Sequence, residues 1–167
     1  RPETHTERQN RKRERQTVLR LSHSFLSIMG TRSRIGKQLA DGSILSVYCH
    51  YDGYPEFNGR VLRDYFSTDE KVSELIDGGD MSATWTNAGW RNETLPKTGP
   101  LHYTQRGESI EDNAPMIHDS LNDFIENGEE FGYVFTSAGW TCYDTKTWSD
   151  TYKQQVAIPA GGITDGN

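Results

Sequence analysis

The chain has 167 residues, of which 33% are apolar, and its 18 Lys and Arg against 24 Asp and Glu give a formal net charge of −6. This length fits one domain and argues against two. No apolar run approaches the ~20 residues that a membrane-spanning helix needs, which excludes that class of protein.

The charge is divided unevenly along the chain. Residues 1–28 hold seven Lys and Arg and three Glu, a net charge of +4, whereas residues 29–167 hold eleven Lys and Arg and twenty-one Asp and Glu, a net charge of −10. The first segment has no sustained apolar period and the first methionine is Met29, so we interpret residues 1–28 as a basic polar tail that is disordered or not part of the native protein. The alternative is a basic arm for nucleic acid or an acidic membrane surface. We expect a single acidic domain over residues 29–160 and a loose C-terminus over residues 161–167.

The first predicted element of the domain is a β-hairpin. Residues 32–39 and 44–52 are strand-like, and the Asp-Gly dipeptide at residues 41–42 is a strong turn signal, because a type I′ turn needs positive φ at both central residues. If this dipeptide is a two-residue loop, the numbers of facing residues add up to 83. That register places Arg34 opposite Cys49.

Two short helices follow the hairpin. Asn58 is a candidate N-cap for the first helix, over residues 58–66, which carries an apolar stripe. The second helix, over residues 67–77, begins with the capping-box spacing from Ser67 to Glu70 and ends at a Gly-Gly pair.

The second half of the chain adds a loop, a helix and another hairpin. Residues 80–100 are rich in Gly, Thr, Asn and Pro and predict a long loop, followed by a short strand at residues 101–105. The strongest helix signal covers residues 113–127, with a proline suited to the first turn. Residues 131–136 and 140–145 form the second hairpin. The predicted fold class is therefore α+β: an antiparallel sheet built from two hairpins, with about three short helices packed on one face.

Cys49 and Cys142 both lie in strand-like runs, and neither has a C-x-x-C partner. We interpret them as reduced, partly buried thiols rather than zinc ligands, and we predict no metal site and no cofactor. A disulfide between them is the main alternative. An arginine facing Cys49 would lower the thiol pKa, although such an arginine more often covers the sheet with its aliphatic stem.

A set of short motifs fills residues 31–80. They are Thr31-Arg32-Ser33-Arg34-Ile35-Gly36, Asp41-Gly42-Ser43, Tyr48-Cys49-His50-Tyr51-Asp52-Gly53-Tyr54-Pro55, Asn58-Gly59 and Leu62. In this pattern the chain resembles a group of small uncharacterised proteins of tailed phages and some bacteria, whose usual signature is "YCHWDGYP" after an Asp-Gly hairpin; here Tyr51 stands where Trp is common. The resemblance supports Met29 as the start. It implies a phage accessory protein that acts in the host cytoplasm, and it implies no activity.

The densest polar cluster of the chain offers a candidate catalytic pair. His50 and Asp52 lie two residues apart in a strand-like run, so their side chains share one face, and Asp52 is placed to fix the tautomer of a His50 base. Tyr54 completes a small site. The alternative is a structural network at a strand-to-turn junction, with Asp52 bonding its own backbone. The chain has no nucleotide-binding loop, metalloprotease helix or nucleophile elbow, which favours a protein that is not an enzyme.

Two other features indicate a binding surface. Trp90 and Trp140 each follow an Ala-Gly pair in a predicted turn, where tryptophans are frequent interface anchors; alternatively, each fills a small core. Residues 108–130 hold eight acidic side chains and no Lys or Arg, which fits either a surface for a basic groove on a partner or a solvated helix face. The acids expected to share one face of the predicted helix are Asp119, Asp123 and Glu126.

These features together predict a non-enzymatic acidic interaction protein that binds a host factor. The alternative is a small-molecule binder or hydrolase that uses His50, Asp52 and Tyr54. We expect a host protein as the partner and no membrane association. Nucleic acid is not expected as a partner of residues 29–167, because phosphates repel an acidic domain.

Overall fold

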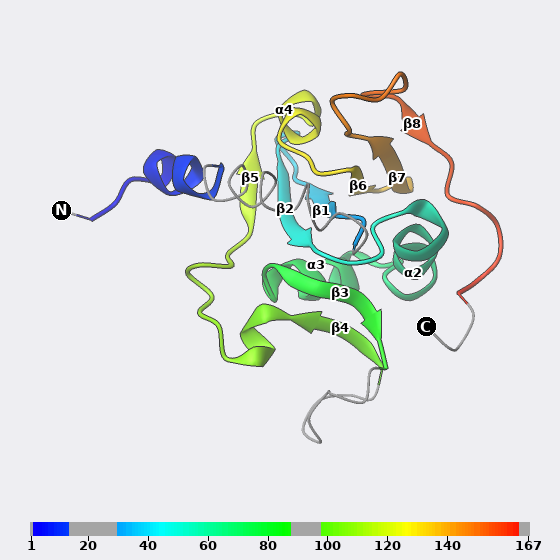
Figure 1. Cartoon of the computed structure of the whole chain (residues 1–167), viewed down its shortest axis with the longest axis horizontal. Helices are drawn as coiled ribbons and strands as arrows, with labels where there is room; N and C mark the ends of the chain where they lie inside the picture. The colour runs from blue at the N-terminus through cyan, green and yellow to red at the C-terminus, as the bar shows by residue number, and fades with distance from the viewer. Residues whose placement is uncertain (1, 14–29, 88–97, 164–167) are drawn as a thin grey trace. The chain divides into compact units, whose positions relative to one another are not determined.

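The structure is a computed structural model that describes residues 2–13, 30–87 and 98–163 of the chain (Figure 1). Contacts divide the chain into two compact units, residues 1–30 and 31–167. The predictions for most of the basic tail, for Trp90 and for the last four residues fall outside the described segments. None of the helices within the described segments is long and apolar enough to cross a membrane.

In the described part of the first unit, residues 5–13 are helical. Its N-terminus has the reciprocal hydrogen bonds of a capping box, because the Glu7 N–H donates to Thr4 Oγ1 at 3.2 Å and the Thr4 N–H donates to Glu7 Oε2 at 2.7 Å. Arg8 and Arg11 form ion pairs with Glu3 on the same segment.

The second unit is built on one mixed sheet of eight strands. The strand order is β4-β3-β2-β1-β6-β7-β8, and β5 pairs with the start of β2, while β3 pairs with its end. The strands are β1 (Ser33–Gln38), β2 (Ile44–Cys49), β3 (Met81–Thr86), β4 (Gly99–His102), β5 (Met116–His118), β6 (Phe131–Thr136), β7 (Gly139–Asp144) and β8 (Gln155–Val156). The helices are the π-helical turn η1 (Pro55–Gly59), α2 (Arg60–Tyr65), α3 (Asp69–Asp77), the 3-10 turn η2 (Tyr103–Arg106) and α4 (Leu121–Glu126).

Both predicted hairpins are present, as β1–β2 and β6–β7, but the predicted register of the first was wrong by one residue. Ser33, not Arg34, faces Cys49. The chain closes around a three-residue loop that ends at Gly42, whose φ is +86°. A three-residue loop with a left-handed glycine adds one residue to the turn and slips the pairing by one position. Arg34 therefore points to the face of the sheet opposite Cys49.

The α+β class is confirmed, but the wholly antiparallel sheet was wrong, because β1 pairs in parallel with β6 and β2 pairs in parallel with β3. The placement of all helices on one face was also wrong. Apolar residues of α2 and α3 pack on the face that carries Ile35 and Tyr133, whereas α4 packs on the other face with Val134. On that second face Gly36 and Gly132 make room for Phe124 of α4, since a Cβ at Gly132 would lie 2.8 Å from the Phe124 ring.

Three local predictions were also wrong. Residues 80–100, expected to be a loop, contain β3 and the start of β4. Residues 113–127, expected to be one helix, contain β5 and only a short α4, which begins after the N-cap Ser120. Asn58 does not cap a helix: it is buried under the first hairpin. In the first two cases strand pairing overrides the local propensity, and in the third the Asn58 side chain bonds Ser33 and Thr84 instead of capping a helix.

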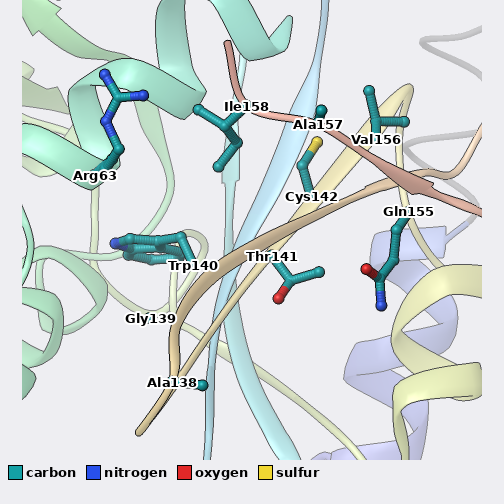
Figure 2. A pocket seen from close by; sticks show the side chains of 10 residues that line it. All are labelled: Arg63, Ala138, Gly139, Trp140, Thr141, Cys142, Gln155, Val156, Ala157 and Ile158. Carbon is teal, nitrogen blue, oxygen red and sulfur yellow. The ribbon is translucent and has the colours of Figure 1, made fainter. Parts of the chain in front are cut away.

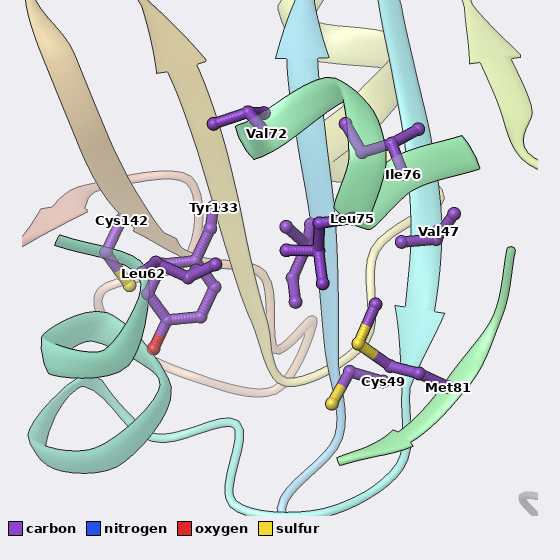
Figure 3. Packing of buried hydrophobic residues seen from close by; sticks show 10 residues of the cluster. Val47, Cys49, Leu62, Val72, Leu75, Ile76, Met81, Tyr133 and Cys142 are labelled. Atoms are coloured by element: carbon purple, nitrogen blue, oxygen red, sulfur yellow. The ribbon is translucent and has the colours of Figure 1, made fainter. Parts of the chain in front are cut away.

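The main core lies between the sheet and the helices α2 and α3 (Figure 3). The α3 helix presents Val72, Leu75 and Ile76 to β1 and β2, as its apolar spacing predicted. Tyr133 crosses this layer, and its hydroxyl donates to the Gly53 carbonyl oxygen at 2.7 Å. This bond ties β6 to the turn after β2, where the predicted polar cluster lies.

Candidate functional site

His50 lies just beyond the end of β2, so strand alternation does not apply to the stretch from His50 to Asp52. The Nδ1 atom of His50 is 2.7 Å from the Tyr48 hydroxyl, and the imidazole packs edge-on against Tyr51. Tyr48 itself is largely buried, and burial raises the pKa of its phenol. The imidazole is thus held by aromatic neighbours just beyond the end of β2.

Asp52 occupies the left-handed region with φ of +59°, an uncommon conformation for a residue other than glycine. Its carboxylate accepts a long hydrogen bond of 3.4 Å from the Tyr54 hydroxyl, and its carbonyl oxygen accepts the Asn58 N–H at 3.2 Å. Burial raises the pKa of the Asp52 carboxyl, and the Tyr54 hydrogen bond opposes that shift. The structure therefore brings Asp52 and Tyr54 together and gives Asp52 a role in the turn as well.

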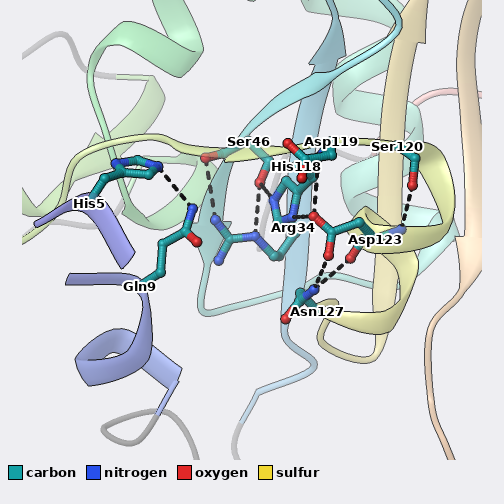
Figure 4. Close-up of polar contacts among 9 residues, drawn as sticks. All are labelled: His5, Gln9, Arg34, Ser46, His118, Asp119, Ser120, Asp123 and Asn127. Atoms are coloured by element: carbon teal, nitrogen blue, oxygen red, sulfur yellow. Dashed lines mark hydrogen bonds and ion pairs between the residues drawn. The ribbon is translucent and has the colours of Figure 1, made fainter. Parts of the chain in front are cut away.

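A cluster that sequence reasoning missed lies on the α4 face of the sheet (Figure 4). We call Arg34, Ser46 and His118 the Arg34 cluster; the three side chains come from β1, β2 and β5 and are at most 1% exposed. The Ser46 Oγ atom accepts the Arg34 Nε–H at 2.9 Å and lies 2.7 Å from His118 Nε2. Burial lowers the pKa of the Arg34 guanidinium, and the negative charges of Asp80 and Glu129 oppose that shift.

The same cluster has the residue types of a serine hydrolase, because Asp123 Oδ2 lies 3.9 Å from His118 Nδ1 (Figure 4). Two observations argue against that chemistry. Ser46 is 0% exposed, so no substrate carbonyl can reach its hydroxyl, and 3.9 Å is too long for the hydrogen bond that orients a catalytic histidine. The cluster instead joins three strands and α4 as a buried polar network.

The predicted acidic face is divided by the structure. Asp119 precedes α4 rather than lying on it, and its N–H donates to Asp123 Oδ2 at 3.1 Å. Asp123 also accepts Asn127 Nδ2 at 2.8 Å, so it has a structural role. Glu126 is exposed and forms an ion pair of 2.9 Å with Lys153 from the far end of the β7–β8 connection.

That connection, residues 145–154, is here called the β7–β8 loop, and one buried carboxylate organises it. Asp144, at the end of β7, accepts the Ser149 hydroxyl at 2.6 Å, the Thr151 hydroxyl at 2.5 Å and the Lys146 N–H at 3.0 Å. Burial raises the pKa of this carboxyl, but these hydrogen bonds outweigh it and lower the pKa to about 2. The loop therefore has a fixed conformation around an ionised Asp144.

Trp148 lies at the tip of the β7–β8 loop and is 73% exposed, the highest value among the large apolar side chains of the described segments. The Ser149 N–H donates to the Lys146 carbonyl oxygen at 3.1 Å, so the backbone on both sides of Trp148 is held. Sequence reasoning missed this residue. A signal was present, because the indole stands in the polar run from Asp144 to Thr151 with no other apolar side chain.

The β7–β8 loop and α4 lie side by side. Lys153 Nζ reaches Glu126 Oε1 and Asn122 Oδ1, both at 2.9 Å, and Tyr152 packs against the apolar cluster that contains Phe124. The two elements form one continuous exterior, which we call the α4–loop surface. Its exposed side chains include Asp119, Asn122, Glu126, Trp148, Asp150 and Lys153.

Trp140, the other predicted interface tryptophan within the described segments, lines a groove of about 450 Å³ along the outer edge of β7 (Figure 2). Its indole N–H donates to the Phe66 carbonyl oxygen at 2.8 Å, so the ring is fixed as a wall of the groove. Arg63 closes one end, and its guanidinium is engaged by the Pro159 carbonyl oxygen at 2.7 Å. Trp140 is thus a packed side chain that borders a groove, and its role as an interface anchor stays a prediction. The lining residues are Arg63, Ala138, Gly139, Trp140, Thr141, Cys142, Gln155, Val156, Ala157 and Ile158.

Cys49 and Cys142 are both free and buried, and burial raises the pKa of each thiol to about 12. Such thiols are protonated at neutral pH and are poor nucleophiles. Within the described segments, no group of three His, Cys, Asp or Glu side chains is placed to hold a metal ion.

Comparisons of the chain with protein-family models, with curated protein sequences and with solved structures found no match.

Proposed function

We propose that the protein is a non-enzymatic interaction protein that binds a basic site on a host protein through the α4–loop surface. The observation that carries the proposal is Trp148, a 73% exposed indole on a loop whose backbone is held, beside the acids of α4. Large aromatic side chains dominate the binding energy of many interfaces. Exposed carboxylates around such a residue steer a basic partner toward it.

Charge supports the same proposal. Residues 29–167 carry a net charge of −10, and Glu126 and Asp150 are both exposed on the α4–loop surface. The resemblance to phage proteins supplies the expectation that the partner belongs to a host cell. The buried serine of the Arg34 cluster and the protonated thiols offer no accessible nucleophile, so binding fits the described geometry better than catalysis does.

The test compares two triple variants with the same change in charge. Asp119→Asn, Glu126→Gln and Asp150→Asn together neutralise the α4–loop surface. The control variant neutralises three exposed acids of α3, which packs on the opposite face of the sheet; they are Glu70, Glu74 and Asp77.

Capture of host proteins from a lysate is then compared at low and at high salt. At low salt we expect the first variant to lose partners and the control to retain them, because only the first variant lacks the carboxylates that attract a basic partner. At high salt the two variants should differ less, because salt screens the attraction between exposed charges. Equal capture by both variants, with the same salt dependence, would contradict the proposal.

A second candidate function keeps one supporting observation. Asp52 is held at positive φ beside Tyr54, with a raised carboxyl pKa, and backbone strain of this kind is concentrated at functional sites. A small-molecule binder or hydrolase would use His50, Asp52 and Tyr54. Replacing Asp52 with Gly relieves the strained backbone and removes the carboxylate, so this function predicts a more stable protein that loses a ligand-dependent rise in Tm. A ligand-dependent rise in Tm that is unchanged in the variant would identify Asp52 as a turn residue only.

A further inference from the structure

In the β7–β8 loop the two lysines are paired with acids of the domain, whereas Asp150 at the tip is exposed. The loop contains two lysines, and both are folded back toward the body of the domain. Lys146 Nζ lies 3.0 Å from Asp144 Oδ1 and 4.1 Å from the centre of the Phe131 ring, while Lys153 Nζ is bonded to α4. Asp150 is exposed, and within the described segments it takes part in no ion pair. The tip therefore presents an exposed Trp148 and, two residues along the chain, an exposed carboxylate that forms no ion pair with another described residue.

An exposed indole beside a carboxylate has a definite chemical preference. The face of an indole attracts a cation, most favourably the flat guanidinium of arginine, which stacks on it. A carboxylate next to the ring accepts the N–H groups of the same guanidinium in a bidentate pair. Lysine offers a point charge that does neither as well, so a site of this composition distinguishes arginine from lysine.

The rigidity of the tip adds to this preference. Ser149, the residue between Trp148 and Asp150, donates its hydroxyl to Asp144 at 2.6 Å, and the Thr151 N–H returns to Ser149 Oγ at 3.2 Å. The backbone that carries Trp148 and Asp150 is therefore held by the same buried anchor. A backbone that is already ordered loses less conformational entropy when a ligand binds.

We propose that Trp148 and Asp150 form a receptor for an arginine side chain in an arginine-rich segment of the partner protein. The inference rests on the proposed function, which it deepens by naming the partner's chemistry. Charge favours a cationic occupant, because residues 29–167 carry a net charge of −10 and Lys146 and Lys153 are paired with Asp144 and Glu126. General acidity explains attraction to any basic partner, whereas this site explains a choice of arginine over lysine.

The experiment titrates the full chain with two fluorescent peptides, octa-arginine and octa-lysine, and follows their polarisation. We expect octa-arginine to bind roughly two- to five-fold more tightly than octa-lysine, the factor that corresponds to a cation–π contact at an exposed site. Trp148→Leu keeps an apolar side chain but removes the aromatic face, so it should abolish this preference and leave the affinity for octa-lysine unchanged. Trp148→Phe should retain part of the preference.

The outcomes separate the inference from the proposed function. If both peptides bind in a salt-dependent way, but the preference for arginine is absent or survives in Trp148→Leu, the arginine receptor is disproved and the acidic surface remains. If neither peptide binds, both proposals fail. The basic residues 8–15 of the chain are present in every variant, so they shift the absolute affinities and not the comparison. Asp150→Asn, with Glu70→Gln on α3 as its matched control, should reduce the preference for arginine and not merely the general affinity.

Discussion

The Arg34 cluster and the β7–β8 loop both tie polar side chains to the sheet, one on its α4 face and the other at the end of β7. In the Arg34 cluster the hydrogen bonds of Ser46 and His118 connect strands, and every member is buried. In the loop the hydrogen bonds of Asp144 hold a turn whose tip carries an exposed Trp148. The Arg34 cluster stabilises the centre of the fold. The hydrogen bonds of Asp144 hold a loop whose exposed tryptophan is not part of the core.

The buried charges of Arg34 and Asp144 have different structural consequences. Arg34 is surrounded by strands and offers nothing to solvent, so its removal should affect the whole sheet. Asp144 is also buried, but its partners all belong to the loop that follows it, so its removal should affect that loop first. Stability measurements on single variants can test whether Arg34 stabilises the whole sheet and Asp144 mainly the loop.

The largest effect is expected for Arg34→Ala. The change removes the donor to Ser46 Oγ and to the Ser46 carbonyl oxygen and deletes a large side chain that is only 1% exposed, which costs about 3 kcal/mol of unfolding free energy. Urea unfolding measures this loss. Arg34→Lys, which keeps the charge but not the forked donors, should lose less. A loss below about 1 kcal/mol for Arg34→Ala would show that the cluster does not hold the sheet together.

A smaller effect is expected for Asp144→Asn. The folded pKa of about 2 lies below the ordinary value of 3.8, so the ionised carboxylate stabilises the folded state above pH 3.8, and this contribution is lost as the pH falls toward 2. A shift of this size corresponds to about 2 kcal/mol at neutral pH.

Unfolding of native protein and Asp144→Asn at a series of pH values measures it. The two stability curves should converge below pH 3.8; a constant difference down to pH 2 would mean that the ionised form is not what matters.

The two networks also differ in how far the sequence predicts them. The hairpins that carry Arg34 and Asp144 follow from alternation and turn signals, and β6–β7 has its predicted bounds within one residue. The Arg34 cluster does not follow, because it needs the correct register of β1 on β2 and the pairing of β5 with β2. Both depend on details that local sequence does not specify: a three-residue loop and a strand hidden within an apparently helical period.

The same limit applies to the candidate sites. His50, Asp52 and Tyr54 were singled out as a polar cluster, and the structure brings Asp52 and Tyr54 together but ends the strand before His50. Two of the acids of residues 108–130 have cations that lie far away in the sequence, because Glu126 pairs with Lys153 and Glu130 with Arg32. Trp148 was visible in the sequence as an isolated aromatic residue, but its exposure depends on how Asp144 folds the loop beneath it.

A still smaller effect is expected where the loop meets α4. Lys153→Met removes the ion pair with Glu126, which is exposed on both sides. Exposed ion pairs contribute little, so the midpoint of urea unfolding should fall slightly at low salt and not at all in about 1 M salt, where the screening length is ~3 Å. Lys71→Met, at an exposed lysine of α3, is the matched control. A large loss at every salt concentration would show that Lys153 matters through its hydrogen bond to Asn122 rather than through the charge of the ion pair.

The smallest effect is expected for Trp148→Ala, and it separates the two networks most sharply. Tryptophan normally contributes to stability by burying its large apolar surface, but here 73% of the side chain remains exposed, so its removal should change the unfolding free energy by no more than about 0.5 kcal/mol. Thermal unfolding of the variant measures this directly. The hydrogen bonds of the loop should persist, because Ser149 and Thr151 hold Asp144 without using the indole. A clear loss of stability would mean that the indole packs onto the domain in solution, and Trp148 would then belong with the Arg34 cluster as a structural residue. An unchanged stability, together with a lost preference for arginine, leaves binding as the reason that this loop is so firmly held.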